Sequence, residues 1–158
     1  LTLEFRPDRI DRLADGSLAI IDYKTGASAD VKAWLDERPR LPQLPAYVQA
    51  LGDDRVHAVA FARVRSGDTG YVGVASDAAL FEGLREPGSS GLLKPYGSWD
   101  ELLGAWRRRL EALAAEYASG EARLAPNPGK ACEYCHLSAL CRIAETDAER
   151  ADEEGGDE

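Results

Sequence analysis

Residues 18–24 read Leu-Ala-Ile-Ile-Asp-Tyr-Lys, an apolar run that ends in an acid and a lysine. A continuous apolar run of this length is typical of a strand buried on both faces at the centre of a sheet. Asp22 ends the run, where a buried carboxylate is costly unless a metal ion or another partner compensates its charge. Strand alternation places Asp22 and Lys24 on the same face. The stretch therefore predicts a central strand that brings a carboxylate and an ammonium together.

A second acid precedes this strand by one short hairpin. Residues 1–6 and 9–13 are predicted to form the first arm, interrupted at Pro7, and residues 14–17 form a turn with Asp-Gly chemistry. Asp11 lies on this arm, so its carboxylate is expected to face that of Asp22 within about 5 Å.

Two carboxylates provide the hard oxygen ligands that Mg²⁺ or Mn²⁺ prefers. Lys24 could orient an attacking water or stabilise charge on a phosphate, so the pattern predicts metal-dependent phosphodiester hydrolysis. Ordinary structural interpretations stay open for each residue. Asp11 could pair with Arg9 or Arg12, Asp22 could cap a turn, and Lys24 could be a solvated lysine at a strand end.

The rest of the chain alternates between helical and strand patterns. Strands are predicted over 56–65 and 70–75, helices near Trp34 and over 44–51, and a loop over 86–97. The clearest helix covers 99–118, with Ser98 and Glu101 as a capping box. These elements predict an α/β domain with a central mixed sheet flanked by helices. The apolar stripe of the last helix is expected to pack in the core rather than to form a partner groove.

The ordered set of residues resembles the RecB-like branch of the PD-(D/E)xK nucleases. The matching segments, all within residues 3–65, are Arg9-Ile10-Asp11-Arg12, Ile21-Asp22-Tyr23-Lys24-Thr25-Gly26 and Gln43-x-x-x-Tyr47. The resemblance implies a restriction-endonuclease-like core in which Asp11, Asp22 and the main-chain carbonyl of Tyr23 bind metal.

The same resemblance implies catalytic roles for Lys24, Gln43 and Tyr47, with Gln43 and Tyr47 on a helix beside the site. Apart from the resemblance, Gln43 could simply be a polar residue at the start of a helix, and Tyr47 a tyrosine of the core. The implied activity is DNA cleavage in recombinational repair, with a helicase domain or subunit as partner. The alternative is a non-catalytic DNA-binding or scaffolding module.

Three cysteines follow near the C-terminus with C-x₂-C-x₅-C spacing: Cys132, Cys135 and Cys141. Disulfides are not expected in a cytoplasmic protein, whereas thiolates so spaced bind zinc or an iron–sulfur cluster. His136 could complete a zinc site, although its position directly after Cys135 is awkward for chelation. A zinc-binding interaction domain is therefore a third hypothesis.

The cysteine trio resembles that of AddB-type nucleases, which carry a [4Fe–4S] cluster. The resemblance implies that the first cysteine ligand lies far upstream, outside these 158 residues. We therefore expect the cluster in the full-length protein and not in this chain alone. Zinc and plain thiols remain alternatives.

Length and composition predict a soluble cytoplasmic domain cut from a longer protein. The chain has no Met, no signal peptide and no apolar run long enough for a membrane. Of its net charge of −9, residues 145–158 contribute −7, from eight acids and one arginine. Three regions are predicted: a nuclease core over 1–129 that lacks its N-terminal part, a cysteine segment over 130–144, and a disordered acidic tail over 145–158.

A helix that carries His or Glu often precedes the first strand in similar nucleases, and none is present here. The isolated chain could therefore be inactive. His57 is expected to be an ordinary surface histidine.

Overall fold

A computed structural model describes residues 4–26, 29–52, 55–89, 91–121, 132 and 135–141. The chain divides into two compact units, Leu1–Ser119 and Gly120–Glu158. The acidic tail and part of the cysteine segment lie outside the described residues. No helix in the described part of the chain has the length and apolar character needed to span a bilayer.

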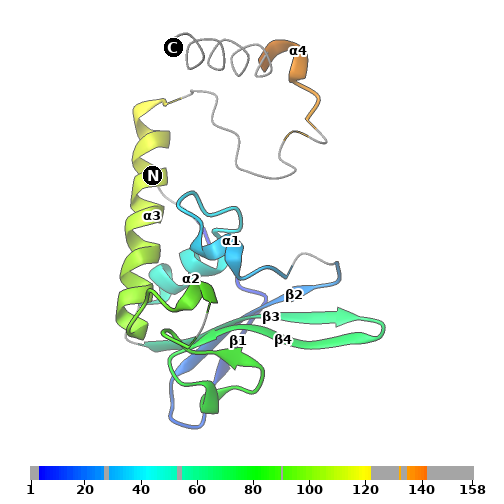
Figure 1. The fold of residues 1–158 in the computed structure, drawn as a ribbon, viewed down its shortest axis with the longest axis vertical. Helices are drawn as coiled ribbons and strands as arrows, with labels where there is room; N and C mark the ends of the chain where they lie inside the picture. Colours follow the sequence, from blue (N-terminus) through cyan, green and yellow to red (C-terminus); the bar gives the residue numbers. More distant parts are fainter. Residues whose placement is uncertain are drawn as a thin grey trace, which may run out of the picture. The chain divides into compact units, whose positions relative to one another are not determined.

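The first unit is built on a five-stranded mixed sheet with the order β1-β2-β3-β4-β5 (Figure 1). The strands are β1 Arg9–Arg12, β2 Leu18–Lys24, β3 Val56–Arg65, β4 Asp68–Ala75 and β5 Leu84–Arg85. β1 and β2 are antiparallel, β2 and β3 are parallel, β3 and β4 are antiparallel, and β4 and β5 are parallel. β2 is paired on both edges, as its continuous apolar run predicts.

Three helices of this unit pack over one face of the sheet: α1 Lys32–Leu35, α2 Gln43–Leu51 and α3 Trp99–Ser119 (Figure 1). The predicted α/β architecture, a mixed sheet flanked by helices, is confirmed. α3 begins at the predicted capping residues, since Glu101 N donates to Ser98 Oγ at 3.2 Å. The Glu101 carboxylate accepts from Gly97 N at 2.6 Å, one residue before the expected partner.

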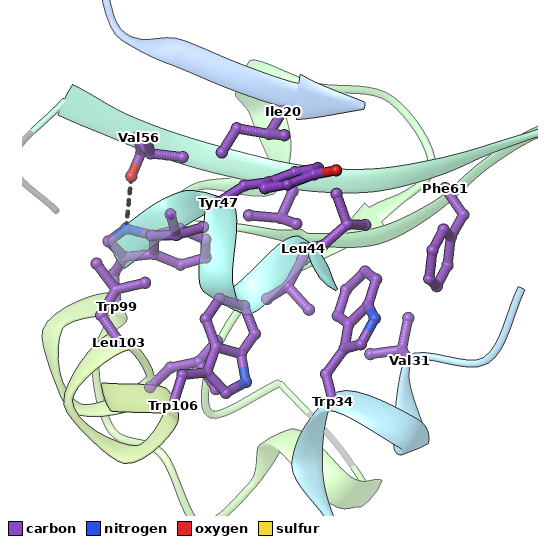
Figure 2. Packing of buried hydrophobic residues seen from close by; sticks show 14 of the residues in the cluster. Ile20, Val31, Trp34, Leu44, Tyr47, Val56, Phe61, Trp99, Leu103 and Trp106 are labelled. Atoms are coloured by element: carbon purple, nitrogen blue, oxygen red, sulfur yellow. Dashed lines mark hydrogen bonds between the residues drawn. The ribbon is translucent and has the colours of Figure 1, made fainter. Parts of the chain in front are cut away.

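The two faces of the sheet carry different side chains. On the helix face, which includes Ile20, Val59 and Phe61, the sheet packs against three tryptophans and other large side chains from the helices (Figure 2). Trp99 Nε1 donates to the Val56 carbonyl at 2.9 Å and fixes the start of α3 to β3. On the alanine face, the buried cluster comprises Ala19, Ala58, Ala60, Ala75 and Leu84.

Two local predictions are wrong and one strand was missed. Residues 4–6 do not form the predicted strand, and the short β5 was not anticipated. The apolar stripe of α3 enters the core only as far as Trp106, whereas Tyr117 is 74% exposed. Leu110 and Leu113 instead line an open groove of about 830 Å³ between α2 and α3.

The second unit contributes the short helix α4, Ser138–Cys141. Cys135 N donates to the Cys132 carbonyl at 3.3 Å, and Cys141 N donates to the Leu137 carbonyl at 2.8 Å. All three cysteines are free thiols, and Cys132 and Cys135 are exposed.

Candidate active site on the helix face

Asp22 and Lys24 form a close ion pair at the carboxyl end of β2. Asp22 is 3% exposed, and Lys24 Nζ lies 2.6 Å from its Oδ2. This buried Oδ2 therefore has the Lys24 ammonium as its charge partner, although no hydrogen bond of good geometry reaches it from the described residues. Desolvation of a carboxylate is costly, and the ammonium or a bound cation offsets that cost. Both side chains share a face, as strand alternation predicts.

Asp11 does not join this pair, which corrects the expected facing carboxylates. In the β1–β2 ladder Asp11 is opposite Ala19, and Ile10 is opposite Ile20. Directly opposed residues project to the same side of a sheet. Asp11 therefore lies on the alanine face with Ala19, whereas Asp22 lies on the helix face with Ile20.

The length of the hairpin loop explains the error. A two-residue Asp-Gly turn would pair Ala14 with Ser17 and place Asp11 opposite Ile20. The observed loop has three residues: Leu13 N donates to the Ser17 carbonyl at 2.8 Å, and Gly16 has φ 89°. A type I turn followed by a left-handed glycine is the usual geometry of such loops. The extra residue shifts the register by one, which moves every side chain of β1 to the other face.

Asp11 has a structural partner on the alanine face. Arg9 Nε donates to Asp11 Oδ1 at 2.8 Å, and its NH2 lies 2.7 Å from Oδ2. The same guanidinium donates to the Tyr23 hydroxyl at 3.1 Å. The hydrogen bond that Arg9 donates to Asp11, with a smaller contribution from the one it donates to Tyr23, raises the pKa of Arg9 above its ordinary value. This bidentate pair is the structural alternative anticipated for Asp11, and it occupies both carboxylate oxygens.

Asp8, rather than Asp11, contacts the carboxyl end of β2. Its Oδ2 accepts from Tyr23 N at 3.1 Å, so the carboxylate lies beside the peptide that joins Asp22 to Tyr23. Arg9 is opposite Ile21, and continuing that register by one residue places Asp8 across from Asp22. Sequence reasoning missed Asp8 because it falls just before the strand. The available signal was the spacing: with a three-residue loop, the hairpin register sets the residue 14 positions before Asp22, which is Asp8, opposite it.

Gln43 and Tyr47 connect α2 to the segment that leads into Asp8. Gln43 Nε2 donates to the Tyr47 hydroxyl at 2.8 Å, and that hydroxyl donates to the Arg6 carbonyl at 3.2 Å. The Phe5 ring meets the Tyr47 ring edge-on, with centroids 5.4 Å apart. The predicted one-turn spacing therefore brings the two side chains together, and Tyr47 contacts Phe5 and Arg6, which lie three and two residues before Asp8.

The described residues fit a divalent cation only in part. Asp8 and Asp22 offer carboxylates, and the buried Oδ2 of Asp22, which pairs with Lys24, is a suitable hard donor. Within the described ranges, no three side chains of His, Cys, Asp and Glu converge on one point. The cysteines therefore form no assembled metal centre there, and no third His, Cys, Asp or Glu side chain among the described residues joins Asp8 and Asp22.

Comparison with known proteins points to the same chemistry. Neither the curated proteins nor the solved structures give a match. The family model of the PD-(D/E)XK nuclease superfamily matches residues 1–142, which is most of the chain and includes both the helix-face pair and the cysteines. Together with the mixed sheet and the Asp22–Lys24 pair, this match shows that the chain belongs to the PD-(D/E)XK nuclease superfamily.

Proposed function

We propose that this chain is the nuclease module of a DNA repair protein and hydrolyses phosphodiesters with Mg²⁺ or Mn²⁺. The observation that carries the proposal is the buried Asp22 carboxylate, 3% exposed and 2.6 Å from Lys24 Nζ. Desolvation of a charged group costs on the order of several kcal/mol, and the attraction within a buried ion pair often does not repay it. A buried carboxylate–ammonium pair is therefore weak evidence for a stabilising role and is consistent with a functional one. Superfamily membership supports the reaction class.

In this proposal Asp22 and Asp8 hold the metal, and Asp11 is a structural residue. The main-chain carbonyl of Tyr23 is the third ligand, as the RecB-like resemblance implies. The bound metal would polarise the scissile phosphate and help to activate a water. Lys24 holds a proton at Nζ, from which it can donate a hydrogen bond to the attacking water or to a phosphate oxygen. Its position beside Asp22 fixes that donor at the reacting centre.

Gln43 and Tyr47 act on the site through the chain that precedes Asp8. Their hydrogen bonds hold the Arg6 carbonyl, and Asp8 follows two residues later. A ligand on a short segment outside a strand needs such support, because a displacement of about 1 Å weakens metal sites and catalysis.

The decisive experiment measures Mg²⁺-dependent cleavage of linear and circular DNA by wild-type protein, Asp22→Asn and Lys24→Ala. Asp22→Asn keeps the side-chain shape and should reduce the rate by a factor on the order of 10³ and also weaken Mn²⁺ binding. Lys24→Ala should reduce the rate by a factor on the order of 10² and leave Mn²⁺ binding nearly unchanged. Asp11→Asn is the matched control.

Two results bear directly on the alternatives. If the natural protein cuts DNA equally well with Asp22→Asn, the pair is structural and the enzymatic proposal is wrong. If wild-type protein binds DNA in a metal-independent way and never cuts it, the chain is a DNA-binding or scaffolding module. RNA in parallel assays shows which nucleic acid is the substrate.

For the cysteines we propose a [4Fe–4S] cluster of the AddB type, completed by an upstream cysteine in the natural protein. The support is the C-x₂-C-x₅-C spacing and the exposed free thiols of Cys132 and Cys135. A cluster would connect this segment to the N-terminal part of the protein and stabilise the domain without taking part in hydrolysis.

Metal analysis of the natural protein, purified without oxygen, tests the cluster. About four irons per chain and a brown colour are expected, and both should be lost with Cys135→Ser. Stoichiometric zinc without iron would favour the zinc-binding interaction domain instead. We further propose a helicase domain or subunit as partner, as the resemblance implies. Purification of the natural protein together with its bound proteins, followed by their identification, tests this partner.

A further inference from the structure

The Lys24 ammonium has a second contact besides Asp22. Its Nζ lies over the ring of Phe61, 5.2 Å from the ring centroid. This distance is within the range of cation–π interactions, in which the negative face of the aromatic quadrupole attracts a cation. The Lys24 side chain is 24% exposed, so the interaction is partly shielded from water.

Phe61 is held rigidly at this position. It is the β3 residue directly beside Asp22 in the parallel β2–β3 ladder, and it is 2% exposed. Its ring lies beside the Trp34 indole, with centroids 4.8 Å apart, and Trp34 in turn meets Trp106 edge-on at 6.1 Å (Figure 2). The aromatic core under the helices therefore continues up to the lysine.

The two contacts of Lys24 respond differently to a metal ion. A cation on Asp22 neutralises much of the carboxylate charge that attracts Nζ, and it also repels the ammonium. The Phe61 ring has no ligand atom for the metal, so its attraction for Nζ persists. The neutral ring is thus the contact that can retain Lys24 when Asp22 is engaged.

We propose that Phe61 is a positioning residue that holds the Lys24 ammonium at the reacting centre while Asp22 binds metal. The proposal rests on the proposed nuclease function of Lys24. It assigns to a core phenylalanine a role that its hydrophobic burial alone would not require, because leucine would fill the same core position without attracting a cation.

A fluorination series at Phe61 tests the electrostatic role with little change in shape. Mono-, di- and trifluorophenylalanine progressively weaken the negative ring face, and the same series at Phe81, which packs against Tyr71 on the alanine face, is the matched control. We expect kcat to fall stepwise by about two- to tenfold in total at position 61, with KM and Mn²⁺ affinity unchanged. A flat series at position 61, in a protein whose Lys24→Ala variant shows the expected loss of rate, would overturn the proposal.

A spectroscopic measurement separates this inference from the nuclease proposal. In NMR spectra of wild-type protein with Mg²⁺, the Lys24 ε-methylene protons should be shifted upfield by the Phe61 ring current. Phe61→Leu should abolish that shift, and Phe81→Leu should preserve it. An unshifted Lys24 signal in the Mg²⁺-bound protein would refute the positioning role whether or not the protein cuts DNA. A shifted signal in a protein without nuclease activity would defeat only the proposed function.

Discussion

The two faces of the sheet differ in what they bury and in which acid they present. The helix face packs three tryptophans and Phe61 beneath the Asp22–Lys24 pair. The alanine face has a small cluster of mostly alanines and pairs Asp11 with Arg9. Both acids come from one hairpin, 11 residues apart in the sequence. Their separation shows that strand parity, rather than proximity in the sequence, decides which carboxylate can share a metal with Asp22.

The largest difference between the faces should be in stability. Trp106 is fully buried at the centre of the helix-face core, and Trp106→Ala should lower the free energy of unfolding by about 3–5 kcal/mol. Phe81 packs only partly buried on the alanine face, so Phe81→Ala should cost less than half as much. Urea denaturation measures both. Equal losses would mean that the alanine face contributes as much core as the helix face.

The second difference concerns metal and activity. Asp8→Asn should lower the DNA cleavage rate by a factor on the order of 10² and weaken Mn²⁺ binding, because it removes a carboxylate beside Asp22. Asp11→Asn changes an acid three residues after Asp8 that lies on the alanine face. Its DNA cleavage rate should stay within about threefold of the wild-type rate. The reverse ranking would restore Asp11 to the site and refute the register argument.

A smaller effect is expected from the hydroxyl of Tyr47. Tyr47→Phe removes the link between Gln43 and the Arg6 carbonyl, which should cost about 1 kcal/mol of stability. Because Asp8 follows that segment, Mn²⁺ affinity should also fall about tenfold. Tyr71→Phe on the alanine face is the matched control and should leave Mn²⁺ affinity unchanged. Isothermal titration with Mn²⁺ distinguishes the two variants.

The smallest effect concerns the turn that sets the register of β1. The hydrogen bond from the Ser17 hydroxyl, followed by that from Ser17 N, lowers the pKa of Asp15. A depressed folded-state pKa stabilises the fold above about pH 4, and this contribution is lost as the pH falls through the folded-state value. Asp15→Asn should therefore destabilise the protein at pH 6 but not at pH 2. A difference that grows on acidification would contradict this assignment.

The sequence predicted most elements because their signals are local. The apolar run of β2 and the capping residues of α3 each determine an element without reference to distant parts of the chain. The pairing of Asp22 with Lys24 followed from alternation within one strand. The one-turn spacing of Gln43 and Tyr47 likewise predicted their contact.

The position of Asp11 could not be read in the same way. It depends on whether the loop at Asp15-Gly16 has two or three residues, and Asp-Gly is compatible with both. One residue in that loop exchanges the faces of every β1 side chain, so a small local ambiguity becomes a reversal at the site. The role proposed for Phe61 was equally hidden, because it requires the parallel β2–β3 register that only the folded sheet defines.

The distribution of tryptophans has an optical consequence. The three tryptophans of the chain, Trp34, Trp99 and Trp106, all lie in the helix-face core. The indole N–H groups of Trp34 and Trp106 are buried and have no hydrogen-bond partner among the described residues, so their emission should be blue-shifted in the folded protein. Intrinsic fluorescence will consequently report the helix face alone. Loosening of β1 or of the alanine face would pass unseen unless a tryptophan were introduced there, for example by Phe81→Trp.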